Sequence, residues 1–266
     1  VTYQDVPLED LSPPAAAAEI GFVQQNPDNQ IVTDFVWHEL AFGLENLGLP
    51  VPVIRRRVAE MAAFFGMETW FRSKTSELSG GQKQLLNLAS TMAMNPKLLI
   101  LDEPTSMLDP LAARNLLSTI ERINRELGVA VLLTEHRLDD VFPVADRVVT
   151  MERGRILSDG APGEIAAALS DAPERHRIYF GLPASVRIFG ALDTAREQIP
   201  LTVRDARQAL SDLLGNTGGV IPDVHDRKKK AAERKPTIAL GAKDLWFRYA
   251  EKGKDVLRGA DLTVYH

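Results

Sequence analysis

One continuous stretch, Leu78–Pro110, constrains the fold more than any other part of the chain. It reads LSGGQKQLLNLASTMAMNPKLLILDEPTSMLDP and joins two polar motifs through one helical segment. The unbroken apolar run Leu98–Leu101 ends in Asp102 and Glu103, and such a run is typical of a parallel strand buried on both faces. Its carboxylates emerge at the carboxyl end of the strand, where open α/β sheets bind ligands. The stretch therefore predicts an α/β fold with an acidic ligand site.

Two adjacent carboxylates at such a strand end can divide one task. Asp102 is the candidate Mg²⁺ ligand, and Glu103 is the candidate general base for a water molecule that attacks a phosphate. Asp109 and Pro110 have the pattern of an N-cap and a first helical residue, and Gly128 is the expected end of that helix. The alternative is a surface turn after a core strand, in which the acids only cap a helix. These residues alone leave both interpretations open.

The residues that open the preceding helix favour the first interpretation. Ser79, Gly80, Gly81 and Gln82 stand at its expected N-terminus. A serine and two glycines there leave backbone N–H groups open to an anion, and the helix dipole adds attraction. A plain N-cap with a flexible entry is the alternative, but it does not account for the carboxylate pair that follows. Both motifs thus point to a nucleotide.

The order LSGGQ and then LLILDEPTSMLDP resembles the signature motif, Walker B motif, catalytic glutamate and D-loop of ABC ATPases. The resemblance implies a P-loop NTPase fold with a helical signature subdomain, ATP and Mg²⁺ as cofactors, and ATP hydrolysis coupled to transport. It places nucleotide contacts at Ser79–Gln82 and Asp109. Met107 and the segment Gln25–Gln30 are similar to the ATPases of energy-coupling-factor importers, which take up vitamins and transition-metal ions. That similarity implies membrane-embedded transport and substrate-binding subunits as partners, and a cytoplasmic location on the inner face of the cell membrane.

Two further residues gain roles from this resemblance. Gln25 looks like the Q-loop glutamine, whose amide reaches the Mg²⁺ and the attacking water. His136, which follows the apolar run Val129–Leu133, looks like the switch histidine that reaches the γ-phosphate. An imidazole suits that place because it can donate a hydrogen bond to a phosphate oxygen. The plain alternatives are a turn glutamine and a structural histidine.

The last thirty residues supply a second resemblance. Ile238–Tyr249 and Val256–Tyr265 look like the two opening strands of an ABC ATPase domain. Tyr249 then falls where the family places an aromatic ring that stacks on adenine. The alternative is a hairpin with an exposed tyrosine.

The remaining pattern predicts several elements. Residues 1–18 show no strong periodicity and predict loop or short edge elements, while Ile20–Val23 predicts a strand. Amphipathic helices are expected at Thr33–Leu47 and Val53–Phe65, where the family carries its helical subdomain and a groove for coupling helices of a membrane protein. Helices packed only on their own core are the alternative. Further downstream, we expect a hairpin at 147–157 and helices that begin near residues 164 and 202.

The resemblance divides the chain into three parts. These are a first ABC ATPase domain at 1–168, a C-terminal extension and charged linker at 169–236, and the start of a second ABC ATPase domain at 237–266. GxxxxGK[ST], the Walker A loop that cradles phosphates, occurs nowhere in the sequence. We therefore expect a fragment of a tandem protein that lacks both Walker A loops and by itself binds MgATP weakly or not at all. Because ABC halves pair head to tail, the strand-end residues would serve one nucleotide site, and the signature motif and Tyr249 the other.

Composition limits the competing functions. The net charge of −5 excludes a global attraction to nucleic acid, and the basic run at 226–235 fits a solvated linker. The absence of cysteine excludes disulfides and thiolate metal sites. A soluble tandem ABC ATPase acting on ribosomes or nucleic acid is the alternative, although such proteins usually carry a strongly basic linker or zinc modules. A third possibility is a degenerate, non-hydrolysing regulatory half. The presence of Asp102, Glu103 and His136 counts against it.

Overall fold

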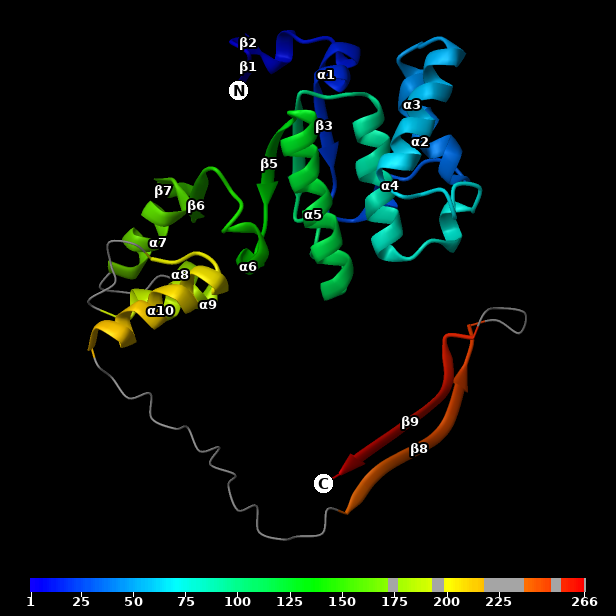
Figure 1. Cartoon of the computed structure of the whole chain (residues 1–266). Helices are drawn as coiled ribbons and strands as arrows, with labels where there is room; N and C mark the ends of the chain where they lie inside the picture. Colours follow the sequence, from blue (N-terminus) through cyan, green and yellow to red (C-terminus); the bar gives the residue numbers. More distant parts are fainter. Residues whose placement is uncertain (172–176, 193–198, 218–236, 250–254, 266) are drawn as a thin grey trace. The chain divides into compact units, whose positions relative to one another are not determined.

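The computed structural model describes residues 1–171, 177–192, 199–217, 237–249 and 255–265, and Figure 1 traces the chain. The chain separates into two compact units, Val1–Asp212 and Leu213–His266. The basic run at 226–235, expected to be a solvated linker, lies outside the described residues.

The first unit contains a parallel sheet of three strands. Its order is β3 (Ile20–Val23), β4 (Leu98–Asp102) and β5 (Ala130–Thr134), and neighbouring strands run in the same direction. Parallel strands need long crossover connections, which helices supply here (Figure 1). The strands predicted at these three places are confirmed.

Four helices lie between the strands of this sheet in the sequence. They are α2 (Val36–Asn46), α3 (Val51–Phe64), α4 (Gly80–Ala93) and α5 (Pro110–Leu127). Each was predicted within a few residues of its bounds. The end of α5 at Gly128 has a φ of 68°, a left-handed conformation that glycine adopts without steric cost.

These helices cover one face of the sheet. Leu99 and Leu101 of β4 are fully buried and share one apolar core with residues of α2, α3, α4 and α5. Phe22 and Leu132 point to the other face, where they pair in register with Ile100 in one row and are 48% and 56% exposed. The prediction that β4 is buried on both faces is therefore wrong, because only one face of the described sheet is covered.

The N-terminal residues hold more structure than predicted. A hairpin joins β1 (Thr2–Tyr3) to β2 (Val6–Pro7), the 3-10 turn Leu8–Asp10 follows, and α1 spans Pro13–Glu19. The expectation of loop or edge elements is wrong for α1. Its run of alanines has the highest intrinsic helix propensity, and its prolines occupy the first turn, where a missing N–H has no helical partner to lose.

After β5, short elements complete the first unit. β6 (Val148–Glu152) and β7 (Arg155–Gly160) form the predicted hairpin. The helices are α6 (Leu138–Val141), α7 (Pro162–Asp171), α8 (Arg177–Gly181), α9 (Ala184–Gly190) and α10 (Val203–Thr217), which runs into the second unit. The helices expected near residues 164 and 202 are thus confirmed.

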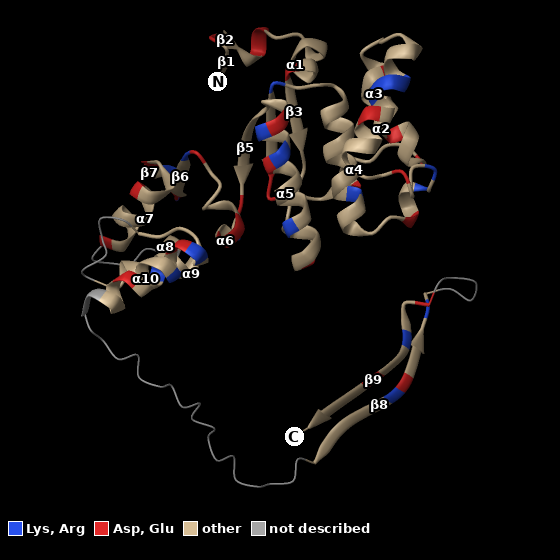
Figure 2. Cartoon of the chain, viewed as in Figure 1, with Lys and Arg blue, Asp and Glu red and all other residues tan. Residues whose placement is uncertain are grey.

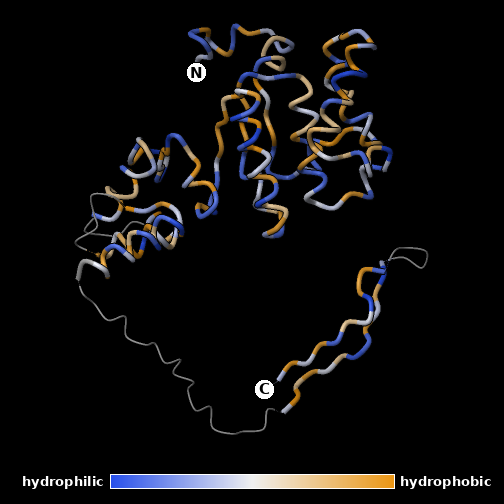
Figure 3. The backbone as a smooth tube through the Cα atoms, in the orientation of Figure 1, coloured by the Kyte–Doolittle hydropathy of each residue, from blue (hydrophilic) through white to orange (hydrophobic). Residues whose placement is uncertain are grey.

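The second unit contains a long antiparallel hairpin of β8 (Ile238–Phe247) and β9 (Leu257–Tyr265). Apolar and polar residues are mixed along both strands (Figure 3). Basic and acidic residues are likewise interspersed over the described elements (Figure 2). No helix among the described residues is long and apolar enough to cross a bilayer.

Candidate functional site

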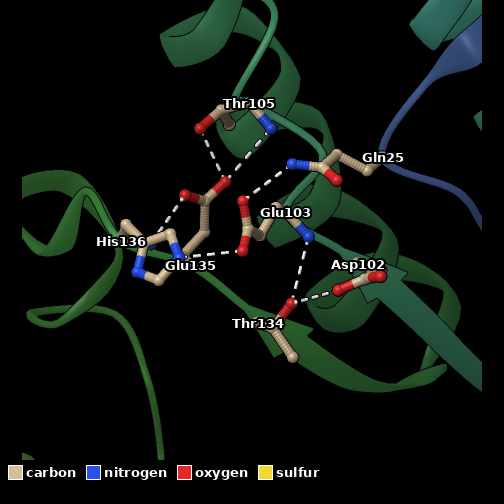
Figure 4. Close-up of polar contacts among 7 residues, drawn as sticks. All are labelled: Gln25, Asp102, Glu103, Thr105, Thr134, Glu135 and His136. Atoms are coloured by element: carbon tan, nitrogen blue, oxygen red, sulfur yellow. Dashed lines mark hydrogen bonds and ion pairs between the residues drawn. The ribbon is translucent and has the colours of Figure 1, made fainter.

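The candidate site lies at the carboxyl ends of the three parallel strands (Figure 4). Asp102 ends β4, and Glu103 follows with a φ of 41°, a conformation that a non-glycine residue rarely adopts. Such strain persists where surrounding contacts hold a residue in place, and it gathers at functional sites. The sharp turn directs the Glu103 carboxylate toward the ends of the neighbouring strands.

The Glu103 carboxylate contacts two other candidate residues of the site. Gln25, two residues past β3, donates a hydrogen bond from Nε2 to Glu103 Oε2 over 2.9 Å. His136, two residues past β5, places Nε2 at 2.8 Å from Glu103 Oε1. The His136 side chain is 84% exposed, whereas that of Glu103 is 27% exposed. Gln25 and His136, which are 111 positions apart in the sequence (136 − 25), thus share the carboxylate of Glu103.

Asp102 is fixed from β5. The Thr134 hydroxyl donates to Asp102 Oδ1 over 2.8 Å and accepts from the backbone N–H of Glu103 over 3.0 Å. The same N–H also points at the Thr134 carbonyl, at 3.2 Å. One threonine therefore orients both members of the carboxylate pair, and sequence reasoning did not identify it.

A second residue missed in the sequence is Glu135. Its Oε1 accepts hydrogen bonds from the backbone N–H and the hydroxyl of Thr105, at 3.1 and 2.6 Å, and its Oε2 accepts from the His136 backbone N–H at 3.2 Å. Thr105 is buried, with 1% of its surface exposed. Glu135 therefore ties the loop after Glu103 to the loop that carries His136. Its only sequence signal is a carboxylate directly before a candidate histidine.

The donor set is compatible with Mg²⁺. Among the described residues, no three His, Cys, Asp or Glu side chains gather into a preformed metal cluster. Mg²⁺ does not require one, since it keeps several waters and binds through one or two carboxylates together with substrate phosphates. Asp102 is exposed at the strand end and offers such a carboxylate. Gln25, whose amide nitrogen faces Glu103, could contribute its amide oxygen.

The second predicted motif opens α4. The Ser79 hydroxyl accepts from the Gln82 backbone N–H, and Gln82 Oε1 accepts from the Ser79 N–H, so the two residues form a capping box. Ser79 and Gly80 are exposed. A Cβ on Gly81 would lie 3.0 Å from Ala112 Cβ, so this position keeps the start of α4 close to the start of α5. Two glycines therefore leave this N-terminus open, as an anion site requires.

Asp109 has a structural role in this conformation. Its Oδ1 accepts hydrogen bonds from the backbone N–H groups of Leu111 and Ala112, at 2.9 and 3.0 Å. The predicted N-cap is confirmed. A nucleotide contact by Asp109 stays a prediction.

Comparison with known proteins identifies the family. A family model described as ABC transporter matches residues 1–106. A protein of Bacillus anthracis named as an ABC transporter ATP-binding protein is 43% identical over 262 residues, which is 98% of this chain and 45% of that protein. The solved structure of cbiO1 from Clostridium perfringens, part of the ABC transporter complex cbiONQ, matches with a TM-score of 0.57 and 34% identity, over 62% of this chain and 67% of that one.

The chain belongs to the ABC transporter family of ATP-binding proteins. The predicted ABC-type α/β fold is thereby confirmed. A further relative, the energy-coupling factor transporter ATP-binding protein EcfA1 of Symbiobacterium thermophilum, is 42% identical over 184 residues, covering 69% of this chain and 63% of that protein. The chain spans about half the length of the curated relatives that it matches first, 45% in the case of the Bacillus anthracis protein.

The remaining candidate residue of this ABC chain is Tyr249, in the second unit. Its side chain is 86% exposed and contacts the Phe247 ring edge-on, with centroids 5.0 Å apart. An exposed ring of this kind offers a surface for stacking, and adenine as its ligand stays a prediction.

Proposed function

We propose that this chain forms part of the ATP-hydrolysing subunit of an ABC importer of the energy-coupling-factor type. The observation that carries the proposal is the Glu103 carboxylate, held between Gln25 and His136 at the ends of three adjacent parallel strands. Open α/β sheets bind their ligands at this edge.

In this proposal each residue of the site has a task. Glu103 accepts a proton from the water that attacks the γ-phosphate, and Gln25 orients that water from the opposite side of the carboxylate. His136 donates a hydrogen bond to a γ-phosphate oxygen from Nε2, which lies next to Glu103. Asp102, oriented by Thr134, holds Mg²⁺. When bound, Mg²⁺ neutralises charge on the phosphates.

The other half of each nucleotide site comes from elsewhere in this proposal. The N-terminus of α4 at Ser79–Gln82 contacts the phosphates of an ATP molecule that is bound to a second ABC half, arranged head to tail with this one. Tyr249 stacks on adenine. The sequence holds no GxxxxGK[ST] loop, so the chain by itself should bind MgATP weakly or not at all. Calorimetry tests this point, and tight Mg²⁺-dependent binding of ATP by these 266 residues would contradict it.

A groove between α2 and α3 supports the proposal that the chain has membrane partners. It has a volume of about 640 Å³ and is lined mostly by apolar residues, including Phe35, Trp37, Val51 and Phe71, with three charged residues among them, Glu45, Arg55 and Arg72. Trp37 and Val51 are 43% and 60% exposed. An apolar groove of this kind fits an amphipathic helix, and we assign it to a coupling helix of a membrane subunit on the cytoplasmic side. The relative named energy-coupling factor transporter ATP-binding protein EcfA1 supports the energy-coupling-factor type, and uptake of a vitamin or a transition-metal ion is part of the same proposal.

The decisive experiment is Glu103→Gln in the full-length protein. The amide keeps the shape of the side chain but cannot accept the proton, so ATP should still bind while the hydrolysis rate falls by about 10²–10⁴-fold. Glu9→Gln, an exposed residue of the 3-10 turn Leu8–Asp10, is the matched control and should keep the full rate. Undiminished turnover by Glu103→Gln refutes the assigned role.

A further inference from the structure

The loop that carries Gln25 lies on α4 and is fastened to it by side chains. Gln84 Nε2 donates to the Gln24 carbonyl over 3.2 Å, and Asn87 Nδ2 donates to the Pro27 carbonyl over 3.0 Å. The two anchored carbonyls flank Gln25 in the sequence. Position 25 is therefore held from both sides by one helix.

Further contacts between the Gln25 loop and α4, and within the loop, hold the loop in place. Gln30 Nε2 donates to Thr91 Oγ1 over 3.4 Å, and Gln30 Oε1 accepts from the Gln24 backbone N–H over 3.0 Å, which closes the loop on itself. Lys83 forms an ion pair with Asp28. All of the α4 residues involved lie on one stripe of the helix, at positions 83, 84, 87 and 91.

The burial of this stripe is unusual for polar residues. Gln84, Asn87 and Thr91 are only 1%, 0% and 3% exposed. Buried amides destabilise a fold unless they are hydrogen-bonded, and within the described part of the chain Gln84 Oε1 and Asn87 Oδ1 have no partner. Apolar side chains of similar size would fill the same space without that cost. The amides therefore serve a purpose other than packing, and the side-chain hydrogen bonds that the structure describes for Gln84 and Asn87 both go to the Gln25 loop.

The same helix begins at the candidate anion site. α4 is a single helix of 14 residues, with Ser79 as its N-cap and the fastened loop against its middle. Gly21 of β3 lies against it so closely that a Cβ there would meet Thr91 Cγ2 at 2.5 Å. A displacement of the N-terminus of α4 therefore moves the anchored carbonyls of Gln24 and Pro27 with it.

We propose that Gln84 and Asn87 are positioning residues, which hold the Gln25 amide against Glu103 and link it to the occupancy of the α4 N-terminus. This inference rests on the proposed function, because it assigns regulation to the same site. A phosphate engaged at Ser79–Gln82 would reach Gln25 through this link. The path runs from α4 through the loop backbone to Gln25 Nε2, 2.9 Å from Glu103 Oε2.

The first test measures position without ATP. In the full chain, the Gln25 side-chain NH₂ resonances are identified by their loss in Gln25→Glu. We expect the variant Gln84→Met/Asn87→Leu to move them toward the values of an unstructured glutamine, with the β4 amides unchanged. Ser185→Ala is the matched control, since it removes a 3.0 Å hydrogen bond from a buried side chain to the distant Leu201 carbonyl and should leave Gln25 unaffected.

Unchanged Gln25 resonances in the folded variant overturn the proposal. If the double variant does not fold, the single variant Gln84→Met is measured in the same way. Gln25 resonances that still match those of the wild type then count against positioning.

The second test uses hydrolysis by the full-length protein and separates positioning from stability. Gln84→Met/Asn87→Leu should lower kcat on the order of tenfold with little change in KM for ATP, because orientation and not binding is lost. In a Gln25→Ala background the same pair should have no further effect, since coupled residues are not additive. Additive losses overturn the positioning role. Loss of the Glu103 dependence of hydrolysis instead contradicts the proposed function, while the resonance shift would still stand.

Discussion

The contact between Glu135 and Thr105 predicts a large loss of stability from one substitution outside the main core. Glu135→Ala removes both hydrogen bonds from Thr105, at 2.6 and 3.1 Å, together with the 3.2 Å bond from the His136 N–H. It leaves the N–H and hydroxyl of the buried Thr105 without that partner, and the two Thr105 bonds dominate the expected loss. Charge-assisted bonds of this kind contribute about 1.5–3 kcal/mol each. Because Glu135 is only half-buried, we take the lower end for both and expect the free energy of unfolding to fall by about 3 kcal/mol. Urea unfolding followed by circular dichroism measures this change.

A double-mutant cycle makes that prediction specific. Thr105→Val removes only the hydroxyl contact and should cost about half as much as Glu135→Ala. The two substitutions together should cost less than their sum by about 1.5 kcal/mol, since both delete the same bond. Glu126→Ala, which breaks an exposed pair with Arg122, is the control and should stay within about 0.5 kcal/mol of the wild type. Strict additivity, or a Glu135→Ala variant as stable as the control, refutes the reasoning.

Three other perturbations follow from the described contacts. Asp109→Ala removes the cap of α5 and should lower the free energy of unfolding by about 1 kcal/mol in urea titrations; no change would mean that the cap contributes nothing. Gly21→Ala forces a Cβ against Thr91 and should cost about 1–3 kcal/mol, whereas a neutral result would show that α4 moves away freely. Bidentate hydrogen bonds from Arg147, at 2.6 and 2.7 Å, hold the pKa of Asp159 below its ordinary value. The stability that this pair contributes is therefore present above the ordinary carboxyl pKa, and it is lost as the pH falls through the lowered pKa of Asp159 in the folded protein. Arg147→Met should remove this contribution, so the melting temperature of the variant should depend less on pH below about pH 4.

Much of the fold could be predicted because its boundaries are encoded locally. Asp109 and Gly128 delimit α5, and Ser79 with Gln82 opens α4, through hydrogen bonds to residues two to four positions away. These signals survive in any tertiary setting. The helix α1 is not predicted by apolar periodicity because a run of alanines has none, although the helix propensity of alanine favours a helix there.

The site could be predicted only in part. Gln25, Glu103 and His136 were found through the order of their motifs, and the structure brings their side chains together. Thr105 and Glu135 are 30 positions apart, so no local pattern connects them. Gln84 and Asn87 were missed for a related reason. A polar residue in an amphipathic helix is expected to face water, and only the loop that lies on α4 reverses this expectation.

The row of Phe22, Ile100 and Leu132 across the parallel sheet also determines how the chain behaves at the bench. Two of these three large side chains leave about half of their surface in water, side by side on neighbouring strands. Exposed apolar patches of this kind promote self-association of the protein as its concentration rises. We therefore expect the purified chain to elute earlier from a sizing column at high concentration, and a Leu132→Lys variant to remain monodisperse for longer.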